Sequence, residues 1–518
     1  MEENKISKGK EILAILLLTM VIATGTFAWI VWSSKDNTKM NITIGDLADV
    51  SFKTGNDINI SNLSPSFYYD DGALTEFSVR KKKGLTTELN TNIYLDITSI
   101  SDELKNDNFK YVLLSSSDGN TYNEVASGSF KDASIGKLSI VTDTPLTDGK
   151  TYYKFYIWID GNNENNETMQ GKSLKGTLNV EVSTPPVNAV TLVEGLDTGS
   201  VGDDGSGVYA VHHDAIPAES SATGSTIPAV TDYRYYGPSP NNYICLDMEG
   251  GSTCPDKHLY RIIGSIYEEK ENTNRIKVIK ATPLTDGTTK GFSWDYTSSG
   301  SNSNIWATIT SGNYSNSLTS GSQLMKLLNS GLWWNGTSGS YYNNSTTATN
   351  VNFTNYKLSD KAKSYITTSR YYLGGYNASS GVMTNQFYTY ERGTTRYDTN
   401  RPLYWDGMVG LMYPSDYGYA AGNTCVTGTD PYNYDGGCKN KDWLWMTTSS
   451  DYSNSAEWLM SSVTDDGTTF RAGSLGFVEG DFDVFSSYFH SVRPTFYLTS
   501  TTSIKSGAGT STDPYILS

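Results

Sequence analysis

Aromatic side chains set among small polar residues are the feature of this sequence that most suggests a chemical task. They occur in Asn-, Ser-, Gly- and Asp-rich stretches of the second half, at Trp333, Trp334, Tyr341, Tyr342, Tyr371, Tyr372, Trp405, Trp443, Trp445 and Tyr488. Aromatic faces stack on the C–H groups of sugars, and Asn and Asp hydrogen-bond hydroxyl groups. The pattern predicts non-catalytic recognition of an extracellular glycan or protein, with Trp333, Trp334, Trp405 and Tyr488 as contacts.

The alternative for these rings is a place in the hydrophobic core, where large aromatic side chains commonly anchor the packing. We favour the core for Trp306 and Trp445. Any of the four expected contacts that proves to be buried would be a core residue instead.

Catalytic motifs are absent from the sequence, which contains no G-x-S-x-G, no H-E-x-x-H and no Walker loop. The adjacent residues His212 and His213 would point to opposite sides of a strand, so we do not expect them to bind one metal ion. Asp481 and Asp483 favour an acidic loop, although the carboxylate pair of a glycoside hydrolase is defined in space rather than in sequence. We expect no enzyme, no metal and no cofactor, with a glycan- or cell-wall-acting hydrolase as an alternative.

An oxygen-rich segment begins at Asp160 with the residues DGNNEN, which resemble the start of a calcium loop. The segment lacks the glycine at the sixth position and the glutamate at the twelfth that such a loop needs. A polar hairpin turn is the better interpretation.

The four cysteines are Cys245, Cys254, Cys425 and Cys438. Three pairings are possible, and proximity favours Cys245 with Cys254 and Cys425 with Cys438. A zinc site is the alternative, but there is no C-x-x-C, and His258 is the only histidine near a cysteine.

Composition and the N-terminal segment indicate an exported protein. Charged residues make up 18% of the chain, whereas glycine and tyrosine are abundant, and the net charge of −16 argues against nucleic acid as a partner. Three lysines precede the uncharged run 12–32. That run is either a membrane anchor with its N-terminus inside the cell or a signal peptide cleaved after Ala28. The protein would lie on the extracellular face of the cytoplasmic membrane or be secreted.

Strand-forming runs and breaker residues divide the rest of the chain into three parts. Regularly spaced β-forming runs in residues 40–183 predict an antiparallel β-sandwich. The Gly-, Ser- and Pro-rich residues 184–232, which begin at the pair Pro185 and Pro186, predict a linker. Residues 233–518 predict an α+β domain, so the fold class is mainly β plus α+β. Within it we expect a hairpin from LYRIIGSIYEE and NRIKVIKAT, and short helices at SGSQLMKLLNSG, at LSDKAKSYITT with Ser359 as N-cap, and at SNSAEWLMSS.

Two parts of the chain resemble known bacterial surface proteins. The stretch LLLTMVIATGTFAWIVWSSKDNTKMNITIGDL and the strands of Tyr153–Ser183 resemble camelysin-like, biofilm-fibre subunit proteins of Gram-positive bacteria, over residues 5–183. The blocks RYYGPSPNNYICLD, LYRIIGSI, VGLMYPSDYGYA and SVRPTFYLTSTTSIKSGAGTSTDPYILS resemble an uncharacterised surface module of Firmicutes. The VRP strand is also similar to the terminal strand of C-type-lectin-like domains, by analogy of fold.

The VRP strand raises the question of why an arginine, Arg493, lies among alternating apolar residues near the end of the chain. We expect the strand to close the second domain near LYRIIG, with Pro494 marking where edge pairing stops. Arg493 would be tied to a carboxylate or to loop carbonyls, and a ligand clamp is the alternative.

These observations predict a cell-surface protein with a membrane-proximal stalk and a distal, adhesin-like ligand-binding domain. The resemblance of residues 5–183 implies a second class, a structural fibre or matrix subunit. Cleavage after Ala28 followed by polymerisation would favour the fibre, and a cleft with close carboxylates would favour the hydrolase.

Overall fold

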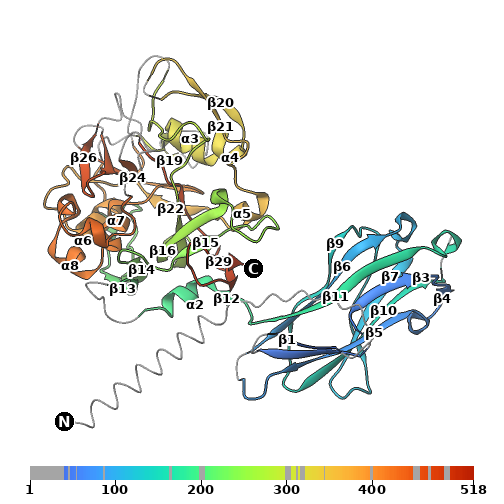
Figure 1. Ribbon diagram of the computed structural model, residues 1–518. Helices are drawn as coiled ribbons and strands as arrows, with labels where there is room; N and C mark the ends of the chain where they lie inside the picture. Colours follow the sequence, from blue (N-terminus) through green and yellow to red (C-terminus); the bar gives the residue numbers. More distant parts are fainter. Residues whose placement is uncertain are drawn as a thin grey trace, which may run out of the picture. The chain divides into compact units, whose positions relative to one another are not determined.

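Figure 1 shows a computed structural model of the chain. The structure describes residues 40–518 except 45–46, 54, 86–87, 163–165, 198–204, 298–304, 308, 311–312, 315–320, 344, 397–400, 447–455, 465–467 and 483–489. At 40–44, 309–310, 313–314, 423 and 481–482 the backbone alone is described. The predicted export segment 12–32 lies outside these residues. Within them, the structure has no helix that is both long and apolar enough to span a membrane.

The chain forms two compact units, Met1–Pro186 and Val187–Ser518. Unit 1 is built from β1 (Met40–Ile44), β2 (Ala48–Phe52), β3 (Asp57–Ser61), β4 (Pro65–Ser66), β5 (Ala73–Lys81), β6 (Asn90–Ile100), β7 (Phe109–Ser116), β8 (Asn123–Ser129), β9 (Gly136–Pro145), β10 (Lys150–Asp160) and β11 (Ser173–Ser183). One sheet has the order β1-β2-β5-β10-β7-β8, with β4 beside β10, and the other has the order β3-β11-β6-β9. Apart from the parallel β4–β10 pair, the strand pairs of both sheets are antiparallel.

Alternation along the strands explains why unit 1 folds as a sandwich. On β10, Tyr153, Phe155, Ile157 and Ile159 face inward and join residues of both sheets in a single hydrophobic core. The predicted antiparallel β-sandwich is confirmed, because each sheet buries one face against the other.

Unit 2 is built around a nine-stranded sheet. Its strands are β12 (Val187–Asn188), β13 (Gly207–His213), β14 (Val230–Tyr236), β15 (Tyr243–Cys245), β16 (Leu259–Glu268), β17 (Thr273–Lys280), β27 (Thr495–Tyr497), β28 (Ser503–Ser506) and β29 (Tyr515–Leu517). The order β12-β28-β29-β15-β16-β14-β13 places the last strands of the chain beside the first strands of the unit, while β17 lies between β16 and β27. The predicted hairpin is confirmed as β16 and β17.

The predicted linker 184–232 is wrong for most of its length. After Pro186 the chain enters β12 and then α2 (Ala189–Glu194), which Asn188 caps by accepting hydrogen bonds from the N–H groups of Val190 and Thr191. Residues 207–213 and 230–236 pair as β13 and β14 and extend the main sheet. Short apolar elements lie between the Gly, Ser and Pro residues. Their side chains Val193 and Val208 are buried in the core of unit 2. The boundary therefore lies at the Pro185–Pro186 pair, which the sequence did mark as a break.

Residues 281–494 leave the sheet after β17 and return on β27, and we call them the excursion. Its helices are α3 (Gln323–Asn329), α4 (Leu332–Asn335), α5 (Asp360–Ser364), α6 (Thr384–Glu391), α7 (Pro414–Ala420) and α8 (Asn423–Gly428). Its strands are β18 (Ile309–Thr310), β19 (Asn313–Tyr314), β20 (Ser338–Tyr341), β21 (Thr349–Asn352), β22 (Ser369–Tyr372), β23 (Tyr404–Gly407), β24 (Glu457–Ser462), β25 (Thr469–Ala472) and β26 (Val478–Phe482). In Figure 1, α3, α4, β20 and β21 gather on one side of unit 2, and α6, α7 and α8 on another.

Two of the three helices expected in the excursion are confirmed and one is wrong. The helix predicted at SGSQLMKLLNSG is α3, and Ser359 caps α5 by accepting a hydrogen bond from the N–H of Ala362. The segment SNSAEWLMSS instead contains β24, which pairs with β25. Trp458, Leu459 and Met460 are all buried, so β24 is covered on both faces and has no period-2 pattern that would have identified it as a strand.

Candidate functional site

The excursion is held at its base by the pairing of the two strands that flank it. Residues Ile279 of β17 and Thr495 of β27 lie opposite each other in the antiparallel register. The N–H groups of Lys280 and Leu284 donate to the carbonyls of Pro494 and Val492, which continues the contact beyond the strands. A long segment with fixed ends can carry many loops on a rigid frame, an arrangement that suits a binding surface.

The structure places the four expected aromatic contacts in different environments. Trp333 is 1% exposed and Trp405 is 0% exposed, so the expectation that these two rings are exposed contacts is corrected: both are core residues. The half-buried Trp334 packs against the same core, and the ammonium of Lys363 lies 5.0 Å from its ring centroid. Tyr488 lies outside the described residues.

The burial of Trp405 follows from its neighbours. Its ring contacts Tyr371 at 5.6 Å and Trp306 at 6.0 Å between centroids, and Trp306 in turn contacts Trp294 at 5.3 Å. A Cβ at Gly407 would lie 1.8 Å from the Trp405 ring, so this position requires glycine. The Asn-, Ser- and Gly-rich surroundings that suggested exposure supply the small residues between which large rings pack.

The two other tryptophans for which the core was expected are also placed. Trp306 is 3% exposed and belongs to the core, as predicted. Trp445 is partly buried against it and donates its indole N–H to the carbonyl of Ser474.

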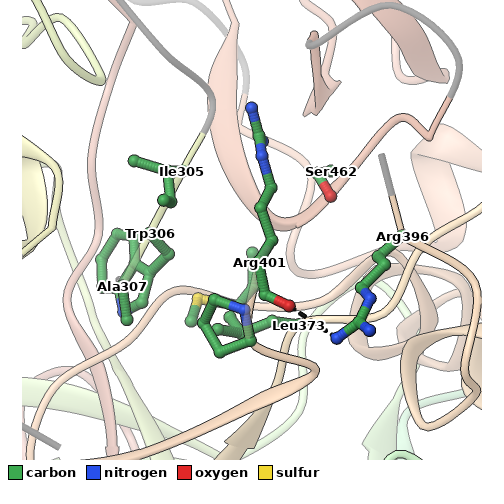
Figure 2. Close-up of a pocket in the computed structure, with 9 residues that line it drawn as sticks. Ile305, Trp306, Ala307, Leu373, Arg396, Arg401 and Ser462 are labelled. Carbon is green, nitrogen blue, oxygen red and sulfur yellow. Dashed lines mark hydrogen bonds between the residues drawn. The ribbon is translucent and has the colours of Figure 1, made fainter. Parts of the chain in front are cut away.

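Trp306 of this aromatic cluster also lines a small depression on the excursion. The depression is lined by Ile305, Trp306, Ala307, Leu373, Arg396, Arg401, Pro402, Met460 and Ser462. Four separate parts of the chain converge there: the segment before α3, Leu373 just after β22, the segment between α6 and β23, and strand β24. Figure 2 shows Arg401 between Trp306 on one side and Arg396 on the other.

The depression has an apolar floor and a polar rim. Trp306, Leu373 and Met460 are buried, whereas Arg396, Arg401 and Ser462 are half-buried. Met460 and Ser462 are two residues apart on β24, so both side chains lie on the same face of the strand. The depression is partly open to solvent, and its volume of about 20 Å³ has room for one or two water molecules.

Hydrogen bonding in the depression is uneven. Arg396 donates from Nη1 to the carbonyl of Arg401 at 2.7 Å, which Figure 2 marks with a dashed line. The indole N–H of Trp306 is buried and has no hydrogen-bond partner. Of the nine described residues that line the depression, two are arginines and none is acidic. The site thus offers donors and positive charge to a small acceptor group.

The buried ion pair of Arg493 and Glu457 explains the place of the arginine in the VRP segment. Arg493 is 2% exposed and donates from Nε and Nη2 to the Glu457 carboxylate, and from Nη2 to the carbonyl of Leu444 at 2.8 Å. The structural interpretation, a tie to a carboxylate and a loop carbonyl, is confirmed. Strand β27 begins just after Pro494 and lies beside β17 rather than beside the LYRIIG strand itself.

A second buried ionic network joins the main sheet to α7. Asp416 accepts hydrogen bonds from Arg234 at 2.9 Å and from Lys277 at 2.5 Å, and Arg234 also donates to Asp232. Burial alone would raise the pKa of Asp416, but the charges of Lys277 and Arg234 hold it below its usual range. These groups satisfy one another, which marks them as structural.

Glu391, at the end of α6, is different from Asp416. Burial raises its pKa to about 7, although the charge of Arg392 and two hydrogen bonds from Ser415 oppose the shift. It lies in the interior, 1% exposed.

The predictions for the histidines and the acidic segments are confirmed only in part. His212 is exposed and His213 is buried, so they point apart as expected. Asp160 accepts hydrogen bonds from the backbone and side chain of Asn162, as in a polar turn, but the turn connects β10 to β11 in the other sheet and is not a hairpin. The side chains of residues 481–483 lie outside the described residues.

One group of possible metal ligands was missed. Donor atoms of Asp247, Glu249 and His258 all lie within 4.8 Å of one another, with the two carboxylates in the loop between Cys245 and Cys254 and the histidine just after it. Glu249 already accepts from Lys257 at 2.8 Å and from His258 at 3.1 Å. The sequence signal for this group is the spacing D-x-E with a histidine nine residues after the glutamate.

Both disulfides predicted from proximity are confirmed. Cys245 is bonded to Cys254, and Cys425 to Cys438. Each bond closes a short loop of unit 2, and Cys245, Cys425 and Cys438 are buried.

No protein-family model matches this sequence, and no curated protein matches it significantly. Function must therefore be argued from the site itself.

Proposed function

We propose that this chain is a non-catalytic, adhesin-like protein of the bacterial cell surface. Unit 1 serves as a membrane-proximal stalk, and the excursion of unit 2 binds an extracellular glycan or protein. The N-terminal segment holds the chain on the extracellular face of the cytoplasmic membrane, or directs its secretion if it is cleaved. Two disulfides support an oxidising compartment outside the cytoplasm.

The observation that carries this proposal is the depression that Trp306 of the aromatic cluster lines. A rigid floor, built by Trp306 and the rings that contact it, supports a rim of arginine and serine side chains. Binding sites combine an apolar base with a few polar groups that fix orientation. Because the floor is fixed by core packing, little ordering entropy would be lost when a ligand binds.

A C-type-lectin-like fold is our proposal for unit 2. Two features support it: the first and last strands of the unit pair with one another, and a long excursion leaves and re-enters the sheet at neighbouring strands. In such an arrangement the excursion carries the ligand site and the sheet supports it, although fold alone does not fix function.

The experiment that tests the proposed function is a glycan and surface-protein array probed with the whole chain in mild detergent. We expect binding that is lost when Arg396 and Arg401 are both changed to Gln, with thermal stability retained. A matched control is Arg80→Gln in unit 1, which removes a positive charge from a side chain that is 61% exposed. Turnover of a glycan or peptide, or binding that depends on unit 1 alone, would contradict the proposal.

A further inference from the structure

We infer that the side chains of Lys277 and Asp416 react with each other and form an amide bond, which ties β17 covalently to α7. This inference goes beyond the proposed function and does not depend on which ligand the chain binds. It is carried by the contact between the two reacting groups, by the charged and aromatic groups around them, and by their place in the fold.

The reacting atoms are already in contact. The Nζ of Lys277 lies 2.5 Å from the Oδ2 of Asp416, and each side chain is 1% exposed. Lys277 is fixed on β17, where it lies opposite Tyr497 of β27. The backbone N–H of Tyr413 donates to the Oδ2 of Asp416 at 3.0 Å and so fixes the carboxylate. Two groups that a rigid frame holds in contact react as if each were present at very high concentration.

The surroundings of Lys277 favour the neutral amine, which is the nucleophilic form of lysine. The Nζ lies 4.4 Å from the ring centroid of Tyr413, in the interior of unit 2. Burial lowers the pKa of this lysine, although the Asp416 carboxylate opposes the shift, and the charges of Arg234 and Arg392 lower it further. The ammonium can therefore lose its proton to the carboxylate beside it, because a buried charge is costly.

Arg234 stabilises the charge that develops in the reaction. Its Nη1 donates to the Oδ1 of Asp416 at 2.9 Å, and its Nη2 donates to Asp232, which fixes the guanidinium. Negative charge develops on Oδ1 when the amine attacks the carboxyl carbon. A fixed donor that already contacts this oxygen stabilises the charge without any rearrangement.

The step balances without a further reactant. The ammonium of Lys277 passes one proton to the Oδ2 of Asp416 along the hydrogen bond, and the neutral Nζ attacks Cγ. The C–N bond forms, a second nitrogen proton moves to Oδ2, the C–Oδ2 bond breaks, and Oδ2 leaves as water. No atom is oxidised or reduced. Because both side chains are buried, water has little access to hydrolyse the amide.

The amide connects the main sheet to the excursion. Lys277 precedes the excursion and Asp416 lies within it, and the two residues are 139 apart in the sequence. The two disulfides join residues that are only 9 and 13 apart. A link across a longer loop constrains the unfolded chain more. The amide is also resistant to reduction, which suits a protein that must keep the excursion in place outside the cell.

The test is peptide mapping by mass spectrometry of the whole folded chain, which is denatured, reduced and alkylated before digestion with trypsin. We expect a branched peptide that joins the segments containing Lys277 and Asp416, with the sum of their masses less one water molecule, and no cleavage after Lys277. Lys280 is the internal control, because this buried lysine of the same strand contacts the carbonyl of Asp256 and the hydroxyl of Thr282 rather than a carboxylate. Trypsin should cleave after Lys280.

Two variants test the roles of the residues. Lys277→Arg keeps a positive charge beside Asp416 but cannot form the amide, so its digest should contain only linear peptides. Arg234→Lys keeps the charge but loses the paired donors, and it should lower the branched fraction several-fold. An unchanged branched fraction in Arg234→Lys would overturn the role assigned to Arg234.

The digest of the original chain decides the inference even if the variants fail to fold. Separate linear peptides with cleavage after Lys277 would overturn it. A branched peptide that joins Lys277 to another carboxylate, such as Glu391, would overturn the assignment of Asp416. Binding on the array is measured independently of the digest, so failure here leaves the proposed function standing.

Discussion

Arg493 and Glu457 form a two-point ion pair in the interior of unit 2, with the arginine Nη2 2.7 Å and Nε 2.8 Å from carboxylate oxygens. The pair joins the segment just before β27 to the first residue of β24. The carbonyl of Leu444 accepts the remaining Nη2 hydrogen bond. Because both side chains are almost fully buried, their charges depend on one another rather than on water.

Removing one member of this pair should therefore destabilise unit 2 strongly. We expect Arg493→Met to lower the free energy of unfolding by about 3–5 kcal/mol, since it leaves Glu457 buried without its partner. The double variant Arg493→Met, Glu457→Met should lose less than the single variant. Chemical denaturation of the whole chain, followed by a probe in unit 2, measures both. A loss below about 1 kcal/mol, typical of exposed pairs, would show that the pair is not structural.

The buried tryptophans should respond as core residues. Trp405→Ala should reduce the free energy of unfolding by about 3–5 kcal/mol, because a large cavity opens between Tyr371 and Trp306. Trp334→Ala should cost clearly less, since this ring is half-buried. Thermal melts of the two variants provide the comparison. Equal and small losses would mean that Trp405 is not part of the core.

The revised boundary between the units makes a prediction about truncation. A fragment of residues 187–518 should fold, whereas a fragment of residues 233–518 should be unstable or insoluble. The shorter fragment lacks β12, α2 and β13, so the core loses Val193 and Val208, and β28 loses β12, one of its two neighbours. The measurements are the solubility and the thermal melt of the two fragments. Equal stability would show that residues 187–232 are a linker after all.

The features that the sequence predicted correctly depend on residues that are close together in the chain. The cap at Ser359 and the two short cysteine loops depend on residues close in the chain, and all were predicted. Strand β24 was missed because burial on both faces removes the alternation that identifies a strand.

The site could be predicted only in part, because residues that are distant in the sequence come together in it. Arg396 and Trp306 lie far apart in the sequence and come together only when the excursion closes. For Trp405, flanking polar residues suggested exposure, but the packing of distant rings decides burial.

The raised pKa of Glu391 makes the stability of unit 2 depend on pH. Burial raises this pKa from the usual 4.5 to about 7, so the folded protein holds a proton that the unfolded chain releases. The stabilising contribution is fully present below pH 4.5 and is lost as the pH rises to about 7, at up to about 1.4 kcal/mol per pH unit. Glu391→Gln removes this dependence, because glutamine is uncharged at every pH.

The measurement is the difference in melting temperature between Glu391→Gln and the original chain, taken from pH 4.5 to 8. We expect the difference to shift in favour of the glutamine variant between about pH 4.5 and 7 and to be constant above that range. Ser415→Ala is a useful companion, because it removes the hydroxyl hydrogen bond that opposes the shift and should move the dependence to higher pH. A difference that does not change with pH would mean that Glu391 is ionised in the folded protein, held so by Arg392.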